Sequence, residues 1–567
     1  MCGIFALINN TFENPIIKDA FNKGRSRGPE YSNLCFGKVD ASVAFGFHRL
    51  AINGLDDISN QPLIYENCSL ICNGEIYNYR QLAKDMKIKL NTNSDCEIII
   101  HLYTKYGIEQ TLSMLDGVFA FVLMDYKKNL IYVARDPYGV RPLFIAKNKN
   151  QFFGFASLMK QLLKLDNSLD ISQFPPGNFL EFKGEYNDNT TNYVSGPFIP
   201  FSSVNSISID TTINTEQRAL QRIRASLEHA VKKRVYNTDR DIACLLSGGL
   251  DSSLIASLVS KFYKKNPRNK NRKLHTWSIG LQGSEDLIKA QEVANFIDSN
   301  HHSIVVTEDD LLEAIDKVIY HTETYDTTSV RASVPNWLIS KHIKDFEKTS
   351  DAKVIFNGDG SDEVAGGYLY FHYIKDPIDF DKECKRLLSD IHFFDVLRSD
   401  RSISSHGLEA RTPFLDRGFV QSYLSIPPFF RCHTVNQLCE KFLIRRAFDD
   451  GKTLPKSVLW RTKEAFSDGV SKQTNSWHDI IKKFVKNKIF TGENYPDNDE
   501  DIIKCLIKKH DIVDNPPKTL EQLFYRIIFE KYFPNKGHTI PYFWMPKFTN
   551  AKDASARSLD IYQLRNN

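Results

Sequence analysis

The second residue of the chain is a cysteine that could become an N-terminal nucleophile. The chain begins Met1-Cys2-Gly3-Ile4, and the small side chain of Cys2 permits removal of Met1. Cys2 would then carry a thiol and a free α-amine, whose unperturbed pKa values are ~8.5 and roughly 7.7–8.0. An amine of this basicity can take the proton of the thiol near neutral pH, as in other nucleophiles paired with an N-terminal amine. The two groups together predict attack on an amide.

A glycine- and serine-rich loop in the second half of the chain has the composition of a phosphate-binding loop. It runs from Ser247 to Ser253 and follows an apolar segment, 241–246, that we predict to be a strand. Two adjacent glycines let the backbone approach an anion, and the serines supply donors at the start of a predicted helix. It is not a Walker loop, because the only Gly-Lys-Thr run, at Gly451, has Arg446 where that motif needs glycine.

An acidic, glycine-rich loop follows a second predicted strand, 354–356. It reads Asn357-Gly358-Asp359 and then Gly360-Ser361-Asp362-Glu363. Mg²⁺ prefers carboxylate oxygens and substrate phosphates, so Asp251 and Asp362 are candidate metal ligands. Loops of this composition are usually solvated turns, but ligands of α/β proteins bind at the carboxyl ends of parallel strands, which favours a binding site here.

The elements that must position these residues divide the chain into two parts. Residues 1 to about 200 contain short apolar segments between turns, among them 118–126 and 130–135, so this part is predicted to be β-rich with helices outside. The stretch 186–212 is rich in Asn, Thr, Ser and Pro and is predicted to be a linker. Strands then alternate with helices, which is typical of a parallel sheet covered by helices on both faces.

We therefore expect two domains, at 2–200 and 213–535, and a polar tail at 536–567. A chain of 567 residues is too long for one core. The net charge of +4 is small, and no basic run carries interleaved aromatic residues, so nucleic acid is not an expected partner. No apolar stretch approaches the ~20 residues of a transmembrane helix, and no signal peptide is evident. The ten scattered cysteines fit reduced thiols in the cytoplasm.

The chain resembles the glutamine-hydrolysing asparagine synthetases from Cys2 to about Trp544. The motifs that carry the resemblance in the front half are Cys2-Gly3-Ile4, Arg27-Gly28-Pro29, His48-Arg49-Leu50, Asn73-Gly74-Glu75-Ile76-Tyr77-Asn78, Ser94-Asp95-Cys96-Glu97 and Arg135-Asp136-Pro137-Tyr138-Gly139. Those in the back half are Leu245 to Ser253, Glu323-Thr324-Tyr325-Asp326, Arg331-Ala332-Ser333, Gly360-Ser361-Asp362-Glu363, Glu409 to Asp416 and Phe466-Ser467-Asp468-Gly469. Each motif is weak alone, and their joint occurrence in this order is specific.

The resemblance implies an N-terminal αββα sandwich of the N-terminal-nucleophile type, followed by a parallel-sheet α/β domain of the pyrophosphate-loop type with helical additions. In the front domain Cys2 would attack the side-chain amide of glutamine, and Asn73 and Gly74 would form the oxyanion hole. The implied glutamine-binding residues are Arg49, Leu50, Ala51, Ile52, Asn53, Asn73, Gly74, Glu75 and Asp95. The guanidinium of Arg49 suits the carboxylate of glutamine, and the carboxylates of Glu75 and Asp95 suit its α-amine.

The resemblance implies that the back domain binds ATP, Mg²⁺ and aspartate, and forms β-aspartyl-AMP and pyrophosphate before ammonia attacks the activated carbonyl. The implied ATP-binding residues are Leu245, Ser247, Gly248, Gly249, Asp251, Ser252, Ser253, Ile279, Asn357, Gly358 and Lys441. Thr328 and Arg331 match positions that line the aspartate site, and Asp251 and Asp362 are the metal ligands. A homodimer is plausible from the family.

One position departs from the family pattern. Asp359 stands where the family usually has glutamate beside the aspartyl-AMP, so the carboxylate is one methylene shorter. A general base must lie within ~3 Å of its proton, and a shift of about 1 Å can cost ~100-fold, so amide formation is the step in question. The alternatives are a related amidotransferase with another acceptor, as in β-lactam-forming relatives, and a degenerate paralogue with a binding or regulatory role.

Overall fold

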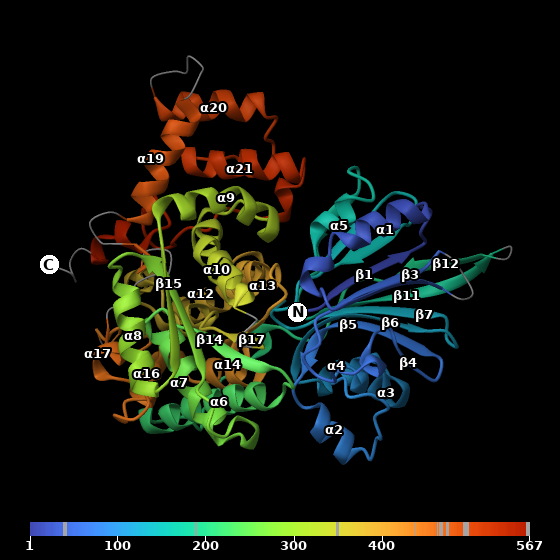
Figure 1. Cartoon of the computed structure of the whole chain (residues 1–567), viewed down its shortest axis with the longest axis horizontal. Coiled ribbons are helices and arrows are strands. Elements are labelled where there is room, and N and C mark those ends of the chain that lie inside the picture. The colour runs from blue at the N-terminus through green and yellow to red at the C-terminus, as the bar shows by residue number, and fades with distance from the viewer. Residues whose placement is uncertain are drawn as a thin grey trace. The chain divides into compact units, whose positions relative to one another are not determined.

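The chain forms two compact units, and the polypeptide passes between them several times. The computed structural model describes residues 1–37, 42–187, 190–346, 351–435, 437–461, 463, 469–471, 476–490 and 498–562. The front unit comprises Met1–Ser206 and two later segments, Asn237–Arg240 and Ser404–Glu409 (Figure 1). The back unit comprises Ile207–Tyr236, Asp241–Ile403 and Ala410–Asn567.

The front unit contains two antiparallel sheets. The first has the order β10-β8-β9-β1-β3-β2 and consists of β1 (Gly3–Ile8), β2 (Tyr31–Phe36), β3 (Ala44–Arg49), β8 (Phe144–Lys147), β9 (Phe153–Ala156) and β10 (Asp170–Gln173). The second has the order β12-β11-β7-β6-β5-β4, with β13 paired to β11, and consists of β4 (Leu63–Tyr65), β5 (Cys68–Ile76), β6 (Gly117–Asp125), β7 (Leu130–Arg135), β11 (Asn178–Asn187), β12 (Thr190–Ser195) and β13 (Ile199–Pro200).

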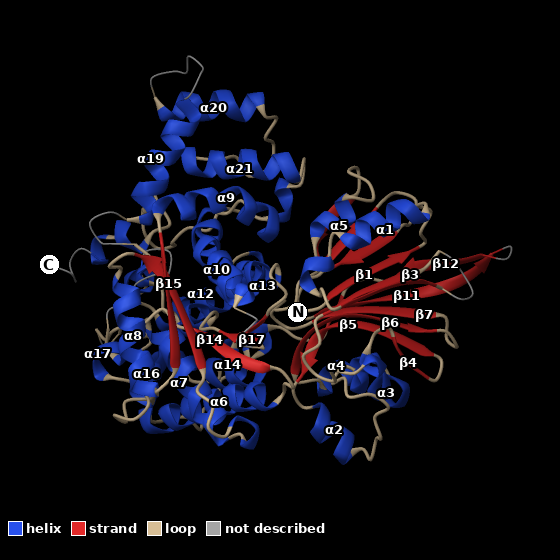
Figure 2. Ribbon diagram, in the orientation of Figure 1, coloured by secondary structure: helices blue, strands red, loops and turns tan. Residues whose placement is uncertain are grey.

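Helices cover the outer face of each sheet (Figure 2). The first sheet carries α1 (Asn14–Asn22) and α5 (Met159–Leu163), and the second carries α2 (Tyr79–Asp85), α3 (Glu97–Tyr106) and α4 (Ile108–Met114). Every residue of β1 is buried, because Phe5 packs on Phe21 of α1 while Ile4 on the other face joins the core between the sheets. Two stacked sheets with helices outside confirm the predicted αββα sandwich.

The prediction of an irregular linker over 186–212 is wrong for part of that stretch. Residues Thr190–Ser195 form β12, which pairs antiparallel with β11. Tyr193 is buried, and its backbone N–H donates to Asn9 Oδ1 over 2.8 Å. Threonine, tyrosine and valine suit an edge strand that buries one face, so pairing partners outweighed the polar composition here.

The back unit is built on a five-stranded sheet with the order β16-β15-β14-β17-β18. Its strands are β14 (Asp241–Leu245), β15 (His275–Leu281), β16 (Asn300–Val306), β17 (Ala352–Phe356) and β18 (Glu409–Arg411), and the first four pair in parallel. The predicted parallel sheet is therefore confirmed. The edge strand β16 was not predicted, because its first residues, Asn300-His301-His302-Ser303, are polar. In the structure these residues are exposed or only partly buried.

Helices surround this sheet and dominate the chain beyond residue 375, as predicted (Figure 2). They are α6 (Glu216–Tyr236), α7 (Leu250–Lys265), α8 (Glu285–Ile297), α9 (Glu308–Thr322), α10 (Thr327–Asp345), α11 (Ser361–Ala365), α12 (Pro377–Asp390), α13 (Asp395–Ser404), α14 (Arg417–Leu424), α15 (Pro428–Arg431), α16 (Phe442–Ala447), α17 (Lys456–Leu459), α19 (Trp477–Phe490), α20 (Asp499–Lys509) and α21 (Leu520–Tyr532).

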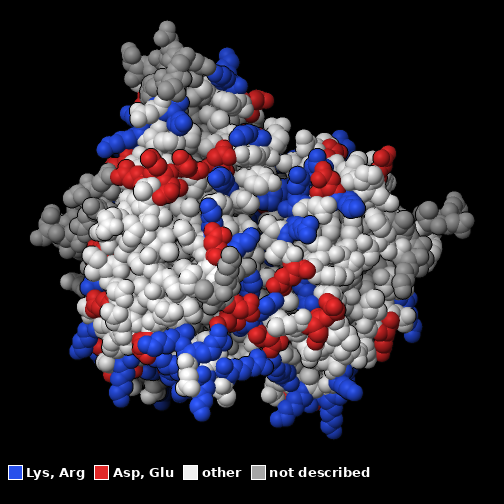
Figure 3. Space-filling model, viewed as in Figure 1, with Lys and Arg blue, Asp and Glu red and all other residues white. Residues whose placement is uncertain are grey.

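The surface carries charges of both signs. On the face drawn in Figure 3, acidic and basic side chains lie near one another, and broad uncharged areas separate these groups. Within the described part of the chain, no helix combines the length and the apolar character that crossing a membrane requires.

Candidate active site

Cys2 lies directly before β1, and its thiol donates to Leu50 O over 3.5 Å. Burial raises the pKa of this thiol from 9.0 to about 11, although the neighbouring N-terminal charge lowers it. Met1 is buried, and its α-amine donates to Leu408 O over 3.1 Å. Burial lowers the pKa of that amine to about 5. With Met1 in place the thiol is therefore protonated near neutral pH, and the amine belongs to the wrong residue.

The predicted oxyanion hole lies in the middle of β5. Asn73 is 1 % exposed, and its Nδ2 has no hydrogen-bond partner among the residues that the structure describes. A Cβ at Gly74 would lie 2.7 Å from Val118 O of the paired strand β6, so the backbone approach requires glycine here. A buried amide donor without a partner is costly unless a ligand completes it. Asn73 thus offers a donor to an oxygen that is not part of the protein.

The other predicted glutamine-binding residues surround β5 and the end of β3. Arg49 is buried and donates to Asp56 O over 2.8 Å and to Asn60 Oδ1 over 2.7 Å, which fixes the following loop. Asn53 Nδ2 donates to Glu75 Oε2 over 2.7 Å, and Asp95 Oδ2 accepts from the Ile76 N–H over 2.6 Å. Leu50, Ala51 and Ile52 are buried in the same loop.

In the back unit, two loops approach each other closely at the carboxyl ends of β14 and β17. Ser247 N–H donates to Ser252 Oγ over 3.1 Å, which closes the first loop onto the start of α7. Gly248 has a φ of 74°. A Cβ at Gly358 of the second loop would lie 2.7 Å from Ser252 N, so only glycine permits this approach.

Two lysines bridge the predicted metal-ligating carboxylates. Lys441 Nζ lies 2.6 Å from Asp251 Oδ2 and 2.6 Å from Asp362 Oδ1. Lys463 Nζ lies 2.9 Å from Asp362 Oδ2 and 3.7 Å from Asp251 Oδ2. The Ser361 hydroxyl also donates to Asp251, over 2.8 Å. Burial raises the pKa of Asp251, but the two ammonium groups outweigh it and hold the pKa below its ordinary value.

Most of the groups in these two loops line one pocket with a volume of about 160 Å³. The predicted residues that line it are Leu245, Ser247, Asp251, Ser252, Ile279, Thr328, Asn357, Gly358, Asp359 and Asp362. Gly248, Gly249, Ser253, Lys441 and Arg331 are not among its lining residues. Lining residues that the sequence reasoning did not select include Trp277, Ser278, Asp286, Asn336, Tyr368, Asp395, Arg398 and Lys463.

A charged cluster forms one wall of this pocket around Arg398 of α13. Arg398 donates to Asp395 Oδ1 over 2.5 Å and to Asp359 Oδ1 over 3.0 Å. Tyr368 OH donates to Asp395 Oδ2 over 2.8 Å. Burial raises the pKa of Asp395, yet Arg398 outweighs it and holds that pKa below its ordinary value. Burial, and then the nearby Asp395, raise the pKa of Glu363 well above its ordinary value.

Asp359 therefore pairs with the Arg398 guanidinium through only one of its two carboxylate oxygens. Its Oδ2 is buried and makes no hydrogen bond within the described part of the chain. Burial raises the pKa of Asp359, while Arg398 opposes the increase. A partly desolvated carboxylate with a spare oxygen is suited to accept a proton.

Only one of the two predicted aspartate-site residues on α10 lines the pocket. Thr328 lines the pocket, and its Oγ1 is buried without a partner among the described residues. Arg331 is 3 % exposed and donates instead to Glu521 and Asp553. Its assignment to aspartate stays a prediction. Of the Phe466-Ser467-Asp468-Gly469 motif, the first three residues lie outside the described residues.

No sequence pattern pointed to Lys463, Asp395 or Arg398. Lys463 is a single lysine shortly before the Phe466 motif, and Asp395 and Arg398 sit three residues apart at the start of an amphipathic helix. The i, i+3 spacing places both side chains on one helical face, which is the only local signal for the pair.

Known protein families and curated proteins match the chain along its whole length. The glutamine amidotransferase domain family matches residues 1–195, and the asparagine synthase family matches residues 222–377 and 374–539. The asparagine synthetase [glutamine-hydrolyzing] of Cricetulus griseus is 39% identical over 589 residues, which cover 99% of both chains. The proteins of that name from Mus musculus and Homo sapiens are 40% and 38% identical, again over 99% of both chains.

Proposed function

Because the chain belongs to the family of glutamine-hydrolysing asparagine synthetases, we propose that its front unit releases ammonia from glutamine and its back unit converts aspartate to asparagine. The chain is an ATP-dependent ligase with glutamine as nitrogen donor. The observation that supports the division of labour best is the pocket in the back unit that most of the predicted nucleotide and aspartate residues line together.

Glutamine hydrolysis begins with Cys2 once Met1 has been removed. The freed α-amine takes the thiol proton, and the thiolate attacks the side-chain amide carbon of glutamine. Asn73 Nδ2 and the Gly74 N–H stabilise the oxyanion, and one such donor is worth ~3–4 kcal/mol in comparable sites. Ammonia leaves with the proton, and water then hydrolyses the thioester to glutamate. Arg49, Glu75 and Asp95 supply the charges that a zwitterionic amino acid requires.

Aspartate activation takes place in the back-unit pocket. The loop Ser247–Ser253 holds the phosphates of ATP at the start of α7, where N–H donors favour anions. The β-carboxylate of aspartate attacks the α-phosphate, and pyrophosphate leaves. Arg398 suits the α-carboxylate and ionised Asp395 suits the α-ammonium, while the unpartnered Thr328 hydroxyl faces the same space. Lys463 lines the pocket, and its ammonium group suits pyrophosphate. Lys441 does not line the pocket but forms ion pairs with Asp251 and Asp362.

Asp251 and Asp362 would be the ligands of a magnesium ion. One ammonium group, that of Lys441, already lies 2.6 Å from an oxygen of each carboxylate, so a single cation can be shared by both. Oxygen ligands of this kind, with substrate phosphates, are those that Mg²⁺ prefers. When bound, the ion would neutralise charge on the phosphates that leave as pyrophosphate.

Asp359 is the candidate base of the amide-forming step. Ammonia attacks the activated carbonyl and must lose a proton, which the spare Oδ2 of Asp359 can accept. The shorter side chain relative to the family's usual glutamate makes this the step to examine.

The products test the proposal directly. Pyrophosphate and asparagine are measured together with aspartate, ATP, Mg²⁺ and either glutamine or ammonia, and equal amounts are expected with both nitrogen sources. Pyrophosphate without asparagine would point to failure at Asp359. If neither pyrophosphate nor asparagine is formed, the proposal is refuted and the binding or regulatory alternative is favoured.

Two further expectations concern the setting of the reaction. All ten cysteines are free thiols, which fits the reducing conditions of the cytoplasm. A homodimer is also proposed, on the family resemblance alone, and light scattering coupled to size-exclusion chromatography would test it.

A further inference from the structure

The helix α10 forms a wall of the back-unit pocket and is weak at its centre. Thr328, Ala332, Asn336 and Ile339 on its inner face line the pocket. Pro335 lies inside the helix and has no N–H to donate to the carbonyl of Arg331, so one helical hydrogen bond is missing. Trp477 of α19 supplies the replacement, because its Nε1 donates to Arg331 O over 3.3 Å. The pocket wall is therefore completed from outside the helix.

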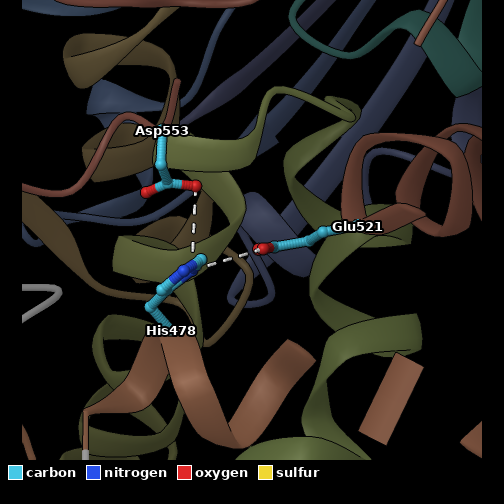
Figure 4. A group of neighbouring side chains, drawn as sticks. All are labelled: His478, Glu521 and Asp553. Atoms are coloured by element: carbon cyan, nitrogen blue, oxygen red, sulfur yellow. Dashed lines mark ion pairs between the residues drawn. The ribbon is translucent and has the colours of Figure 1, made fainter. Parts of the chain in front are cut away.

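An ion-pair network holds α10 at Arg331, next to the residues that line the pocket. Arg331 Nε donates to Glu521 Oε1 over 2.8 Å, and its two terminal nitrogens lie 2.9 Å from the two carboxylate oxygens of Asp553. One of these nitrogens also lies 2.8 Å from His478 Nδ1. Figure 4 shows His478 between the two carboxylates. His478, Glu521 and Asp553 are metal-ligand types, but the guanidinium already bonds all three groups and supplies the positive charge there.

The same C-terminal segment also holds the start of α10. We define the C-terminal strap as residues 537–558. The Trp544 N–H donates to Asp326 Oδ1 over 2.7 Å, and Asp326 caps α10 by accepting from the Ser329 N–H over 2.9 Å. Tyr325 OH donates to Gly537 O over 2.7 Å. The Trp544 ring lies 5.1 Å from the ring of Tyr368, a pocket residue.

The strap closes a small cavity that adjoins the pocket. Trp544 and Tyr542 line this cavity together with Thr328, Tyr368 and Asp395, and the last three also line the main pocket. Two of these shared residues, Thr328 and Asp395, are proposed to bind aspartate, whereas the nucleotide loops follow β14 and β17. A shift of the strap would therefore reach the aspartate side of the pocket first.

We propose that the C-terminal strap positions the aspartate subsite, with Asp553 and Trp544 as positioning residues that act through Arg331 and Asp326 on α10. The inference rests on the proposed function of the back-unit pocket. Asp553 stays ionised near neutral pH, because the hydrogen bonds from Arg331 hold its pKa well below the ordinary value although burial raises it.

The test compares Asp553→Asn, Asp553→Glu and the matched control Asp560→Asn, all in the full chain. Asp560 is an exposed acid of the same tail, so the control makes the same charge change outside the network. The assay is aspartate-dependent exchange between ATP and labelled pyrophosphate, with glutamine hydrolysis measured on the same samples as evidence of folding. Asp553→Asn is expected to raise the KM for aspartate about tenfold, with the KM for ATP and glutamine hydrolysis within twofold of wild type.

Two further readouts separate positioning from a general loss of structure. Asp553→Glu should recover most of the aspartate KM, and Asp560→Asn should match wild type. Hydrogen exchange in the peptide 322–332 should be faster in Asp553→Asn, and peptides of the front unit should be unchanged. An unchanged aspartate KM, or equal increases in the KM values for aspartate and ATP, would overturn the inference. Absence of exchange in wild type would instead refute the proposed function.

Discussion

Retention of Met1 should abolish the reactivity of Cys2, because the buried thiol then lacks the α-amine that would take its proton. Burial raises the thiol pKa from 9.0 to about 11, and the charge of the Met1 α-amine offsets only part of this increase. At pH 8 a thiol with a pKa of 11 is only about 0.1% thiolate, roughly 100-fold less than a thiol with a pKa of 9, so the buried Cys2 depends on a nearby base to take its proton. Glutamine hydrolysis also loses its base, because the α-amine then belongs to Met1 and donates to Leu408 O. We expect at least a 100-fold loss of glutaminase activity.

The two forms can be prepared from a cleavable N-terminal fusion that leaves either Met1 or Cys2 first, and intact mass verifies each. Alkylation of Cys2 by iodoacetamide is followed by peptide mapping between pH 7 and 11. The Met1 form should label slowly at pH 8 and faster as the pH rises towards about 11. Cys505, an exposed thiol, serves as the internal control and should label equally in both forms.

Ammonia-dependent synthesis provides the second control, because it bypasses Cys2. The Met1 form should retain it, as should Cys2→Ala. The reasoning is refuted if the Met1 form labels at Cys2 as fast as the Cys2 form at pH 8, or hydrolyses glutamine within tenfold of it.

Three other changes test the back unit. Gly358→Ala places a methyl group 2.7 Å from Ser252 N, so exchange between ATP and pyrophosphate should fall at least 100-fold while glutamine hydrolysis is unchanged. Lys463→Met should raise the KM for ATP about 10- to 100-fold, because it removes a charged hydrogen-bond donor worth ~1.5–3 kcal/mol, and Lys463→Arg should recover part of it; an unaltered KM would remove Lys463 from the phosphate site. Asp359→Asn should release pyrophosphate in excess of asparagine, and Asp359→Glu should restore equal amounts; equal amounts in Asp359→Asn would assign the base elsewhere.

Local composition predicted the elements that carry the phosphate loops, because their signals are short-range. The apolar strand before Ser247 and the glycines at 248 and 249 specify strand, turn and helix within about ten residues. The strand Thr190–Ser195 was missed for the opposite reason. Its polar residues become a strand only because β11, an earlier segment of the chain, presents a free edge.

The charged wall of the pocket could not be predicted because it is assembled from distant segments. Arg398 acquires its role from Asp359, which lies 39 positions earlier in the chain. Lys463 and Lys441 converge on Asp251 from about 200 positions away. The ion pairs of Arg331 are formed with Glu521 and Asp553, which lie near the C-terminus, and no pattern around Arg331 reveals these partners.

The division of the chain into interlaced rather than consecutive units limits how the enzyme can be taken apart. A fragment that stops at Ser206 would lose Asn237, whose amide donates to Glu75, and Arg240, whose guanidinium donates to Glu30. It would also lose Leu408, the acceptor of the N-terminal amine. A glutaminase unit that is expressed on its own therefore has to contain three separate stretches of sequence. Truncation of the chain at a single site between the two units should destabilise the glutaminase.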